Sequence, residues 1–204
     1  MSLSLVTAPV EYPILLADVR VQTRREGFTG DDSLVSDFII PGVVDRAELS
    51  TRRQMIEATW DWFREGFPAD GRALEIPKPP LVELVEVEYR DTAGVAQTWD
   101  ASNYVVEAPA GPRCARGRLA PAYGASYPSV RQGPGAVRIR FRAGYGPDPE
   151  DVPGLLRQAM LMDAATLYVQ RQTVLTGTIV AALPGGVADI YASFCSHPTR
   201  LVSP

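Results

Sequence analysis

Three arginines alternate with apolar residues in the stretch VRIRFRAGYG, at positions 137–146. Arg138, Arg140 and Arg142 share one face of the strand that this alternation predicts, because successive side chains of a strand point to opposite faces. Guanidinium groups bind phosphate and carboxylate well. The row therefore predicts one of two arrangements: a surface that binds the DNA backbone, or a set of ion pairs with carboxylates of the protein itself.

Carboxylates suited to the second arrangement lie in another predicted strand, residues 82–90. Glu86 and Glu88 share one face of that strand. If the two strands are neighbours, arginine and glutamate meet across the ladder, and each such pair contributes roughly 0.2–1 kcal/mol. We expect the arginines to face these glutamates, within the sheet or across a contact between subunits.

The overall charge favours ion pairs. The chain has 20 Lys and Arg against 24 Asp and Glu, a formal net charge of -4. Proteins whose main task is binding nucleic acid usually carry a basic surplus, because phosphate neutralisation supplies much of their affinity. A DNA-binding module that uses the face of Arg138, Arg140 and Arg142 is the alternative hypothesis.

The sequence offers no catalytic, cofactor-binding or metal-binding motif. It contains no G-x-S-x-G elbow or P-loop, and no G-x-G-x-x-G after a strand. His197 is the single histidine, and Cys114 and Cys195 form no C-x-x-C pair, so no zinc site of the usual Cys/His kind is expected. We expect a protein that is not an enzyme. Reduced thiols are favoured for the two cysteines, with a single disulfide as the alternative.

The chain also carries no targeting or membrane signal. Its first residues, MSLSLVTAPVEYP, lack a basic region followed by a long apolar core. No apolar run approaches the roughly 20 residues that span a bilayer. We expect a soluble protein, made in a cytoplasm and not bound to membrane.

The hydrophobic period changes twice along the chain. Helical spacing is predicted at 14–25, at 31–54, where Pro41 breaks or kinks the helix, and again at 153–172 and 187–194. Between these helices, period-two strands are predicted at 56–63, 73–76, 82–90, 95–99, 104–107 and 137–142, with a long loop at 108–136. The fold class is therefore α+β, a helical core with an inserted antiparallel β-rich region. Its parts are 1–54, 55–146 and 147–204, which form one composite domain.

The helix at 153–172 carries a predicted buried stripe, with Leu156 and Met160 beside it. The stripe consists of Leu155, Ala159, Met162, Thr166 and Val169.

Six segments in order resemble the head–tail connector (adaptor) proteins of tailed bacteriophages and gene transfer agents. They are FPADGRALEIPKPPL at 67–81, VEVEYRDTAGVAQTW at 85–99, LAPAYGASYP at 119–128, VRIRFRAGYG at 137–146, DVPGLLRQAMLMDAATLYVQR at 151–171 and LP at 183–184 with GGVADIY after it. The resemblance extends from about Leu15 onward, and LLADVR fits the family's first helix. Pro41-Gly42 departs from the family's uninterrupted second helix.

The resemblance implies a structural virion protein at the head–tail junction, made in the cytoplasm of a bacterial host. Such connectors form a homo-oligomeric ring, typically of twelve subunits, which docks under the portal protein. The ring extends the DNA channel, through which DNA passes without sequence-specific contact, and presents a surface to a tail or stopper protein. No cofactor is implied.

The C-terminal part is the expected portal-docking segment. Residues 173–186 are apolar but interrupted by glycine and proline, and the helix at 187–194 is amphipathic. Such apolar side chains need a surface to cover them. The expected docking residues are Leu175, Ile179, Val180, Leu183, Ile190, Tyr191 and Phe194.

Overall fold

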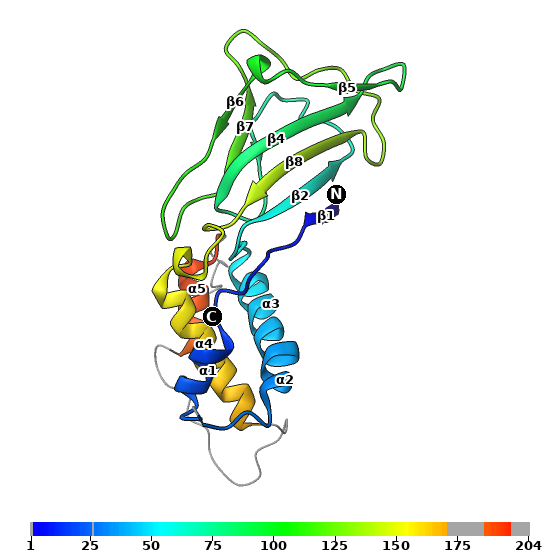
Figure 1. Ribbon diagram of the computed structural model, residues 1–204. Coiled ribbons are helices and arrows are strands. Elements are labelled where there is room, and N and C mark those ends of the chain that lie inside the picture. The colour runs from blue at the N-terminus through cyan, green and yellow to red at the C-terminus, as the bar shows by residue number, and fades with distance from the viewer. Residues whose placement is uncertain (1, 26, 171–185, 197–204) are drawn as a thin grey trace, which may run out of the picture. The chain divides into compact units, whose positions relative to one another are not determined.

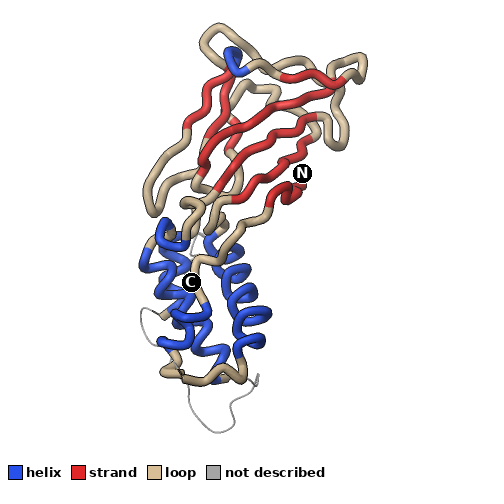
Figure 2. Tube along the Cα trace, viewed as in Figure 1, coloured by secondary structure: helices blue, strands red, loops and turns tan. Residues whose placement is uncertain are grey.

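The computed structural model describes residues 2–25, 27–170 and 186–196, and the chain divides into two compact units (Figure 1). The sheet unit comprises residues 1–9 and 57–145, and the helical unit comprises residues 10–56 and 146–204. All the strands lie in the first unit, and nearly all the helical residues lie in the second (Figure 2). The predicted α+β class is confirmed.

The larger sheet of the sheet unit has five strands in the order β1-β2-β8-β4-β5, and all neighbours are antiparallel. Its strands are β1 (Ser2–Thr7), β2 (Ala58–Arg64), β4 (Leu81–Arg90), β5 (Ala96–Thr98) and β8 (Val137–Ala143). Strand β1 corrects the prediction that all of 1–54 is helical. Its sequence SLSLVT alternates polar and apolar residues, which is the period of a strand.

The smaller sheet has three antiparallel strands in the order β3-β7-β6. They are β3 (Leu74–Glu75), β6 (Tyr104–Glu107) and β7 (Arg118–Pro121), and a 3₁₀ turn, η2 (Ala101–Asn103), precedes β6. Strand β7 lies inside the predicted loop 108–136, so that prediction is wrong at these four residues. A strand this short, next to Gly117 and ending in proline, shows no period of its own.

One apolar core joins the two sheets. Leu74 and Leu119 of the smaller sheet cluster with Val87, Ile139 and Phe141 of the larger one. Aromatic rings extend this core: the rings of Phe67 and Tyr127 stack at 4.8 Å, and those of Trp99 and Tyr104 lie 5.0 Å apart. The tryptophans belong to the core as well, since Trp62 and Trp99 are buried and Trp60 packs against it.

The helical unit contains seven helical segments among the described residues. They are α1 (Leu16–Gln22), α2 (Asp32–Leu34), the π-helix η1 (Val35–Ile39), α3 (Ile40–Thr51), the 3₁₀ turn η3 (Pro149–Asp151), α4 (Gly154–Val169) and α5 (Val187–Phe194). Pro41 lies in the first turn of α3, directly after the π-helix. The change of helix type falls where proline removes a backbone donor, so the predicted kink is a π turn that leads into an α-helix.

Helix α4 packs against α1, α3 and α5. Its buried residues are Leu156, Ala159, Met160, Asp163 and Ala164. The predicted stripe is therefore wrong for Leu155, Met162 and Val169, which are 42%, 36% and 76% exposed. Apolar residues occur all round this helix, so the neighbouring helices decide which side is covered.

Candidate functional site

The three arginines lie on one face of β8, the central strand of the five-stranded sheet. The strand alternates strictly, with Val137, Ile139 and Phe141 fully buried on the opposite face. The apolar side chains hold the strand in the core, and this fixes the side on which every arginine emerges. We call this surface the arginine face.

Two irregularities in β4 bring its glutamates onto the same face. The pairing between β4 and β8 shifts between Leu81 and Glu83 and again between Leu84 and Glu86, so Val82 and Val85 are extra residues. Without the second bulge, positions 83 and 86 would point to opposite faces, because their separation is odd. With it, each glutamate lies opposite an arginine: Glu83 opposite Arg142, Glu86 opposite Arg140 and Glu88 opposite Arg138.

Arg138 contacts three carboxylates. Its Nη2 lies 2.9 Å from Glu86 Oε2 and 2.6 Å from Glu88 Oε2, and its Nε donates to Glu88 Oε2 at 2.9 Å. Its Nη1 lies 3.4 Å from Asp61 Oδ2, on the neighbouring strand β2. This guanidinium therefore links β4 to β2 across the central strand.

Arg140 makes a two-point contact with Asp61. Its Nε and Nη2 donate to the two carboxylate oxygens, each at 2.8 Å, in the paired geometry that suits a guanidinium and a carboxylate. The Asp61 side chain is only 9% exposed. The hydrogen bonds from Arg140 hold the pKa of Asp61 below its usual range, against the opposite effect of burial. The same contact raises the pKa of Arg140.

Arg142 completes the face at the end of the strand. Its Nη1 lies 3.2 Å from Glu57 Oε1, and its Nε lies 3.0 Å from Glu83 Oε1 as an ion pair without hydrogen-bond alignment. The Arg142 and Glu83 side chains are 39% and 52% exposed, so water screens this contact more than it screens the Asp61 pair.

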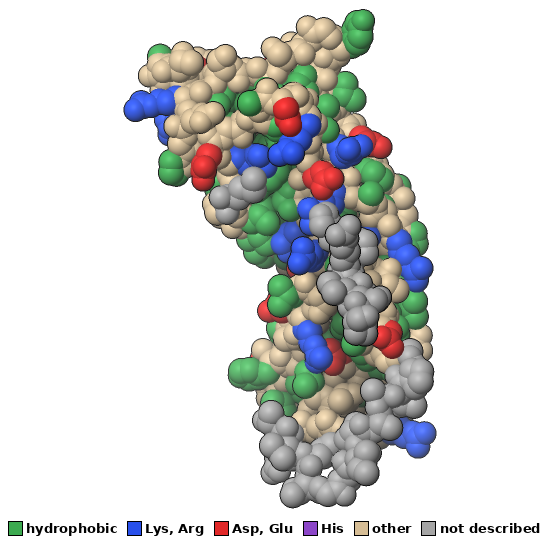
Figure 3. All heavy atoms as spheres, turned by 180° about the vertical axis from the view of Figure 1, so that it is seen from behind, with side chains coloured by type: hydrophobic (Ala, Val, Ile, Leu, Met, Phe, Trp, Pro, Cys, Tyr) green, Lys and Arg blue, Asp and Glu red, His purple; other side chains and the backbone are tan. Residues whose placement is uncertain are grey.

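The arginine face as a whole carries a negative surplus. Three arginines lie within ion-pair distance of five carboxylates: Glu57, Asp61, Glu83, Glu86 and Glu88. A phosphate approaching it would have to displace carboxylates that are already seated on the guanidinium groups. In the view of Figure 3, basic and acidic side chains are likewise interspersed, with no single basic patch. The face is built to satisfy its own charges.

The sequence identified part of this arrangement. Glu86 and Glu88 were the expected partners, and the structure brings both to Arg138. It did not assign Asp61 or Glu57, whose alternation with Trp60 and Trp62 was the available signal. Asp61 precedes Arg140 by 79 residues, and their contact depends on a strand pairing that no local pattern specifies.

Of the expected portal-docking residues, three lie in described positions. Tyr191 and Phe194 are each 3% exposed and belong to the core of the helical unit, whereas Ile190 is half-buried. Arg53, itself buried, donates from Nε to the carbonyl of Phe194 at 2.6 Å. Tyr191 and Phe194 thus anchor α5 to its own unit. The other expected docking residues lie outside the described residues: Leu175, Ile179, Val180 and Leu183.

A buried carboxylate lies beside this helix. Asp163 Oδ1 accepts from Arg46 Nη1 at 3.0 Å, and Asp163 Oδ2 has no hydrogen-bond partner among the described residues. Burial raises the pKa of Asp163. Burial, together with the nearby Asp163, also raises the pKa of Tyr191, whose buried hydroxyl likewise has no partner in the described part of the chain.

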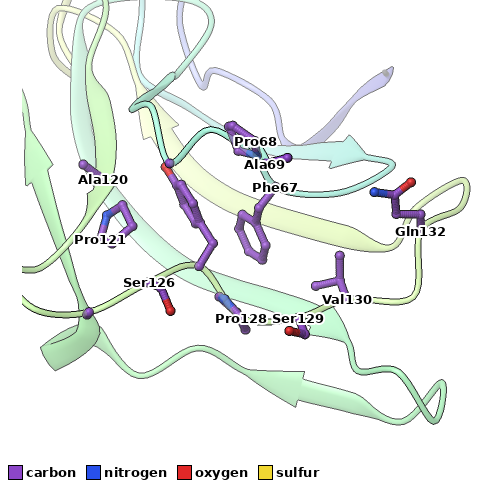
Figure 4. A pocket seen from close by; sticks show the side chains of 13 residues that line it. Phe67, Pro68, Ala69, Ala120, Pro121, Ser126, Pro128, Ser129, Val130 and Gln132 are labelled. Atoms are coloured by element: carbon purple, nitrogen blue, oxygen red, sulfur yellow. The ribbon is translucent and has the colours of Figure 1, made fainter.

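An open pocket of about 590 Å³ lies in the sheet unit (Figure 4). Phe67, Pro128 and Val130 contribute to its wall, and Tyr127 is its sole ionisable side chain. The hydroxyl of Tyr127 lies 3.0 Å from two backbone carbonyl oxygens, of Arg72 and Leu119, which engage its proton. The pocket therefore presents no acid–base pair.

Within residues 2–25, 27–170 and 186–196, no group of three or more His, Cys, Asp or Glu side chains could hold a metal ion. Asp151 instead caps a helical turn, where its carboxylate accepts from the backbone N–H of Asp148 at 3.1 Å. Cys114 and Cys195 are free thiols. None of the described helices has the length and apolarity to cross a bilayer.

No protein-family model and no curated protein matches the chain. Solved structures do. A chain in the neck of an empty gene transfer agent particle, with C6 symmetry, is 24% identical with a TM-score of 0.79, over 100% of both chains. A chain in the virion of a native gene transfer agent particle is 23% identical with a TM-score of 0.79, over 100% of this chain and 99% of that one. A chain in the neck of a native particle, with C12 symmetry, is 23% identical with a TM-score of 0.71, over 100% of both. The likeness establishes a shared fold along the whole chain.

Proposed function

We propose that this chain is a structural protein of the neck of a tailed virus or gene transfer agent: a head–tail connector that forms a ring under the portal. The observation that carries the proposal is the full-length match, at a TM-score of 0.79, to a chain of a gene transfer agent neck. A match over 100% of both chains leaves no additional domain on either side to supply a different activity.

The arginine face supports the same role. A conduit for DNA must let the duplex slide, so its surfaces should not bind phosphate. Here all three guanidinium groups of β8 are held by carboxylates, with two negative charges in excess. We assign these arginines to stability of the sheet unit and not to DNA binding.

We retain the portal as partner and place its contact in the C-terminal part of the chain. Because Tyr191 and Phe194 are buried in the helical unit, the docking surface is assigned to the apolar residues of 173–186 and to Ile190. On the far side, the ring would present a surface to the tail or stopper protein. The protein would be made in the cytoplasm of a bacterial host and incorporated into the virion.

Loss of the chain tests the proposal. Cells that make particles without it should yield heads and tails that are separate, and a plasmid-borne copy should restore joined particles. Electron micrographs and the protein content of purified particles provide the measurement. Joined, tailed particles in the absence of the chain would contradict the proposal.

A further inference from the structure

The five-stranded sheet ends in two open edges of unusual composition. Strand β1 forms one edge, and all six of its residues are exposed. Leu3, Leu5 and Val6 of this strand are 39%, 45% and 46% exposed. The strand contains no charged residue and no proline. Natural edge strands are usually protected by such residues, because unpaired backbone groups otherwise bind another strand.

The opposite edge is equally unprotected. Strand β5 carries Ala96, Gln97 and Thr98, all exposed and uncharged. The one irregularity of β1 lies between Leu5 and Thr7, so its first residues present a regular ladder. The same sheet therefore offers two different strand edges that can accept a partner strand by backbone hydrogen bonds.

We propose that β1 of one subunit pairs with β5 of the next, so that the five-stranded sheets join edge to edge around the ring. The inference rests on the proposed connector function and deepens it, because it names the contact between subunits. A ring needs two different surfaces on each subunit, whereas a two-fold contact uses one surface twice and stops at a dimer. The two edges of this sheet are such a pair of surfaces.

The direction of the new pairing follows from the strand count. All neighbours in the five-stranded sheet are antiparallel, so β1, β8 and β5 run the same way. Rotation about a ring axis preserves strand direction in a continuous sheet, and the junction between subunits is therefore parallel. A junction between two copies of β1 would instead be antiparallel.

Engineered cysteines distinguish these pairings. Ser4 lies opposite Asp61 and Thr98 lies opposite Glu88, so both occupy the arginine face. Within one chain these positions are four strand spacings apart, about 19 Å. A disulfide requires Cα atoms within about 7 Å, so Ser4→Cys with Thr98→Cys can link only different subunits. Ser4→Cys with Ala96→Cys tests the neighbouring register on the same face.

The matched control is Ser4→Cys with Gln97→Cys. Gln97 lies opposite Tyr89, on the other face of the sheet, so its side chain points away from Ser4 in any register. Ser4→Cys alone and the parent chain, which retains its two native cysteines, complete the set.

Particles assembled with each variant are purified, oxidised and separated on a non-reducing gel. One of the two same-face pairs should convert most of the monomer band into a ladder of multimers that reductant collapses, with the controls at the level of the parent. Monomer from both pairs, in particles that still contain a ring of the chain, would overturn the edge contact and leave the connector function standing. Dimers from Ser4→Cys alone would also overturn it, in favour of a two-fold pairing. Absence of the parent chain from purified particles would instead refute the connector function itself.

Discussion

Replacing Asp61 by asparagine should destabilise the sheet unit by about 1–2 kcal/mol at pH 7. The substitution keeps the shape of the side chain and one acceptor but removes the charge that faces Arg138 and Arg140. Hydrogen bonds to charged groups contribute roughly 1.5–3 kcal/mol, and loss of a buried partner costs more than loss of an exposed one. Asp61 is 9% exposed but Arg140 is 31% exposed, and water around Arg140 compensates part of the loss.

The effect should depend on pH with a defined sign. Hydrogen bonds from Arg140 lower the pKa of Asp61 in the folded protein. A carboxyl with a lowered pKa contributes stability that is complete above its unfolded value, about 3.9, and is lost as the pH falls through the folded pKa. The asparagine variant has no such group. The difference in stability between the two proteins should therefore shrink as the pH falls below about 4.

Urea unfolding followed by tryptophan fluorescence is the suitable assay. The three tryptophans, Trp60, Trp62 and Trp99, all belong to the sheet unit, so the signal reports that unit alone. The control is Glu83→Gln, at a side chain that is 52% exposed, for which the expected loss is about 0.5 kcal/mol or less. An Asp61→Asn protein as stable as the parent at pH 7, or a difference that persists unchanged in acid, would refute the role assigned to this pair.

Three further predictions concern the arginine face and the helical unit. Neutralising three carboxylates should free the arginines and create duplex-DNA binding that weakens with added salt in fluorescence anisotropy, while the parent binds negligibly; the changes are Glu83→Gln, Glu86→Gln and Glu88→Gln. Leu156→Ala should cost about 2–5 kcal/mol, because Leu156 is fully buried, and Leu155→Ala less than about 1 kcal/mol, both measured by circular dichroism at 222 nm; equal losses would contradict the observed side of α4. Tyr191→Phe should be neutral or stabilising by up to about 1 kcal/mol, since its hydroxyl is buried without a partner, whereas Phe194→Ala should cost about 3–5 kcal/mol in thermal unfolding.

The sequence predicted the features that repeat over several residues. Strand β8 was evident because the alternation of Val137, Ile139 and Phe141 with arginines leaves one placement for each face. Strand β6 and helix α5 also have the predicted bounds, 104–107 and 187–194. In each case, local propensity and burial point to the same structure.

Features that depend on distant partners were not predictable in this way. The bulge at Val85 has no sequence period, yet it decides that Glu83 joins Glu86 opposite the arginines. The buried side of α4 is set by α1, α3 and α5, and its own apolar residues did not identify Leu156 over Leu155. Pairing and packing of this kind are decided by surfaces brought together from far along the chain.

The insertion of residues 57–145 between the two halves of the helical unit has a consequence for synthesis on the ribosome. Strand β1 and all other strands are complete once residue 143 has left the exit tunnel, whereas α3 must wait for α4, whose first residue follows Thr51 by about a hundred positions. At translation rates of roughly 5–20 residues per second, the delay is about 5–20 s, far longer than most small domains need to fold. The sheet unit should therefore fold first, while the apolar side of α3 stays uncovered until α4 emerges. Nascent chains stalled after residue 150 should already protect the sheet unit from protease, with α3 still open to cleavage or bound by a chaperone.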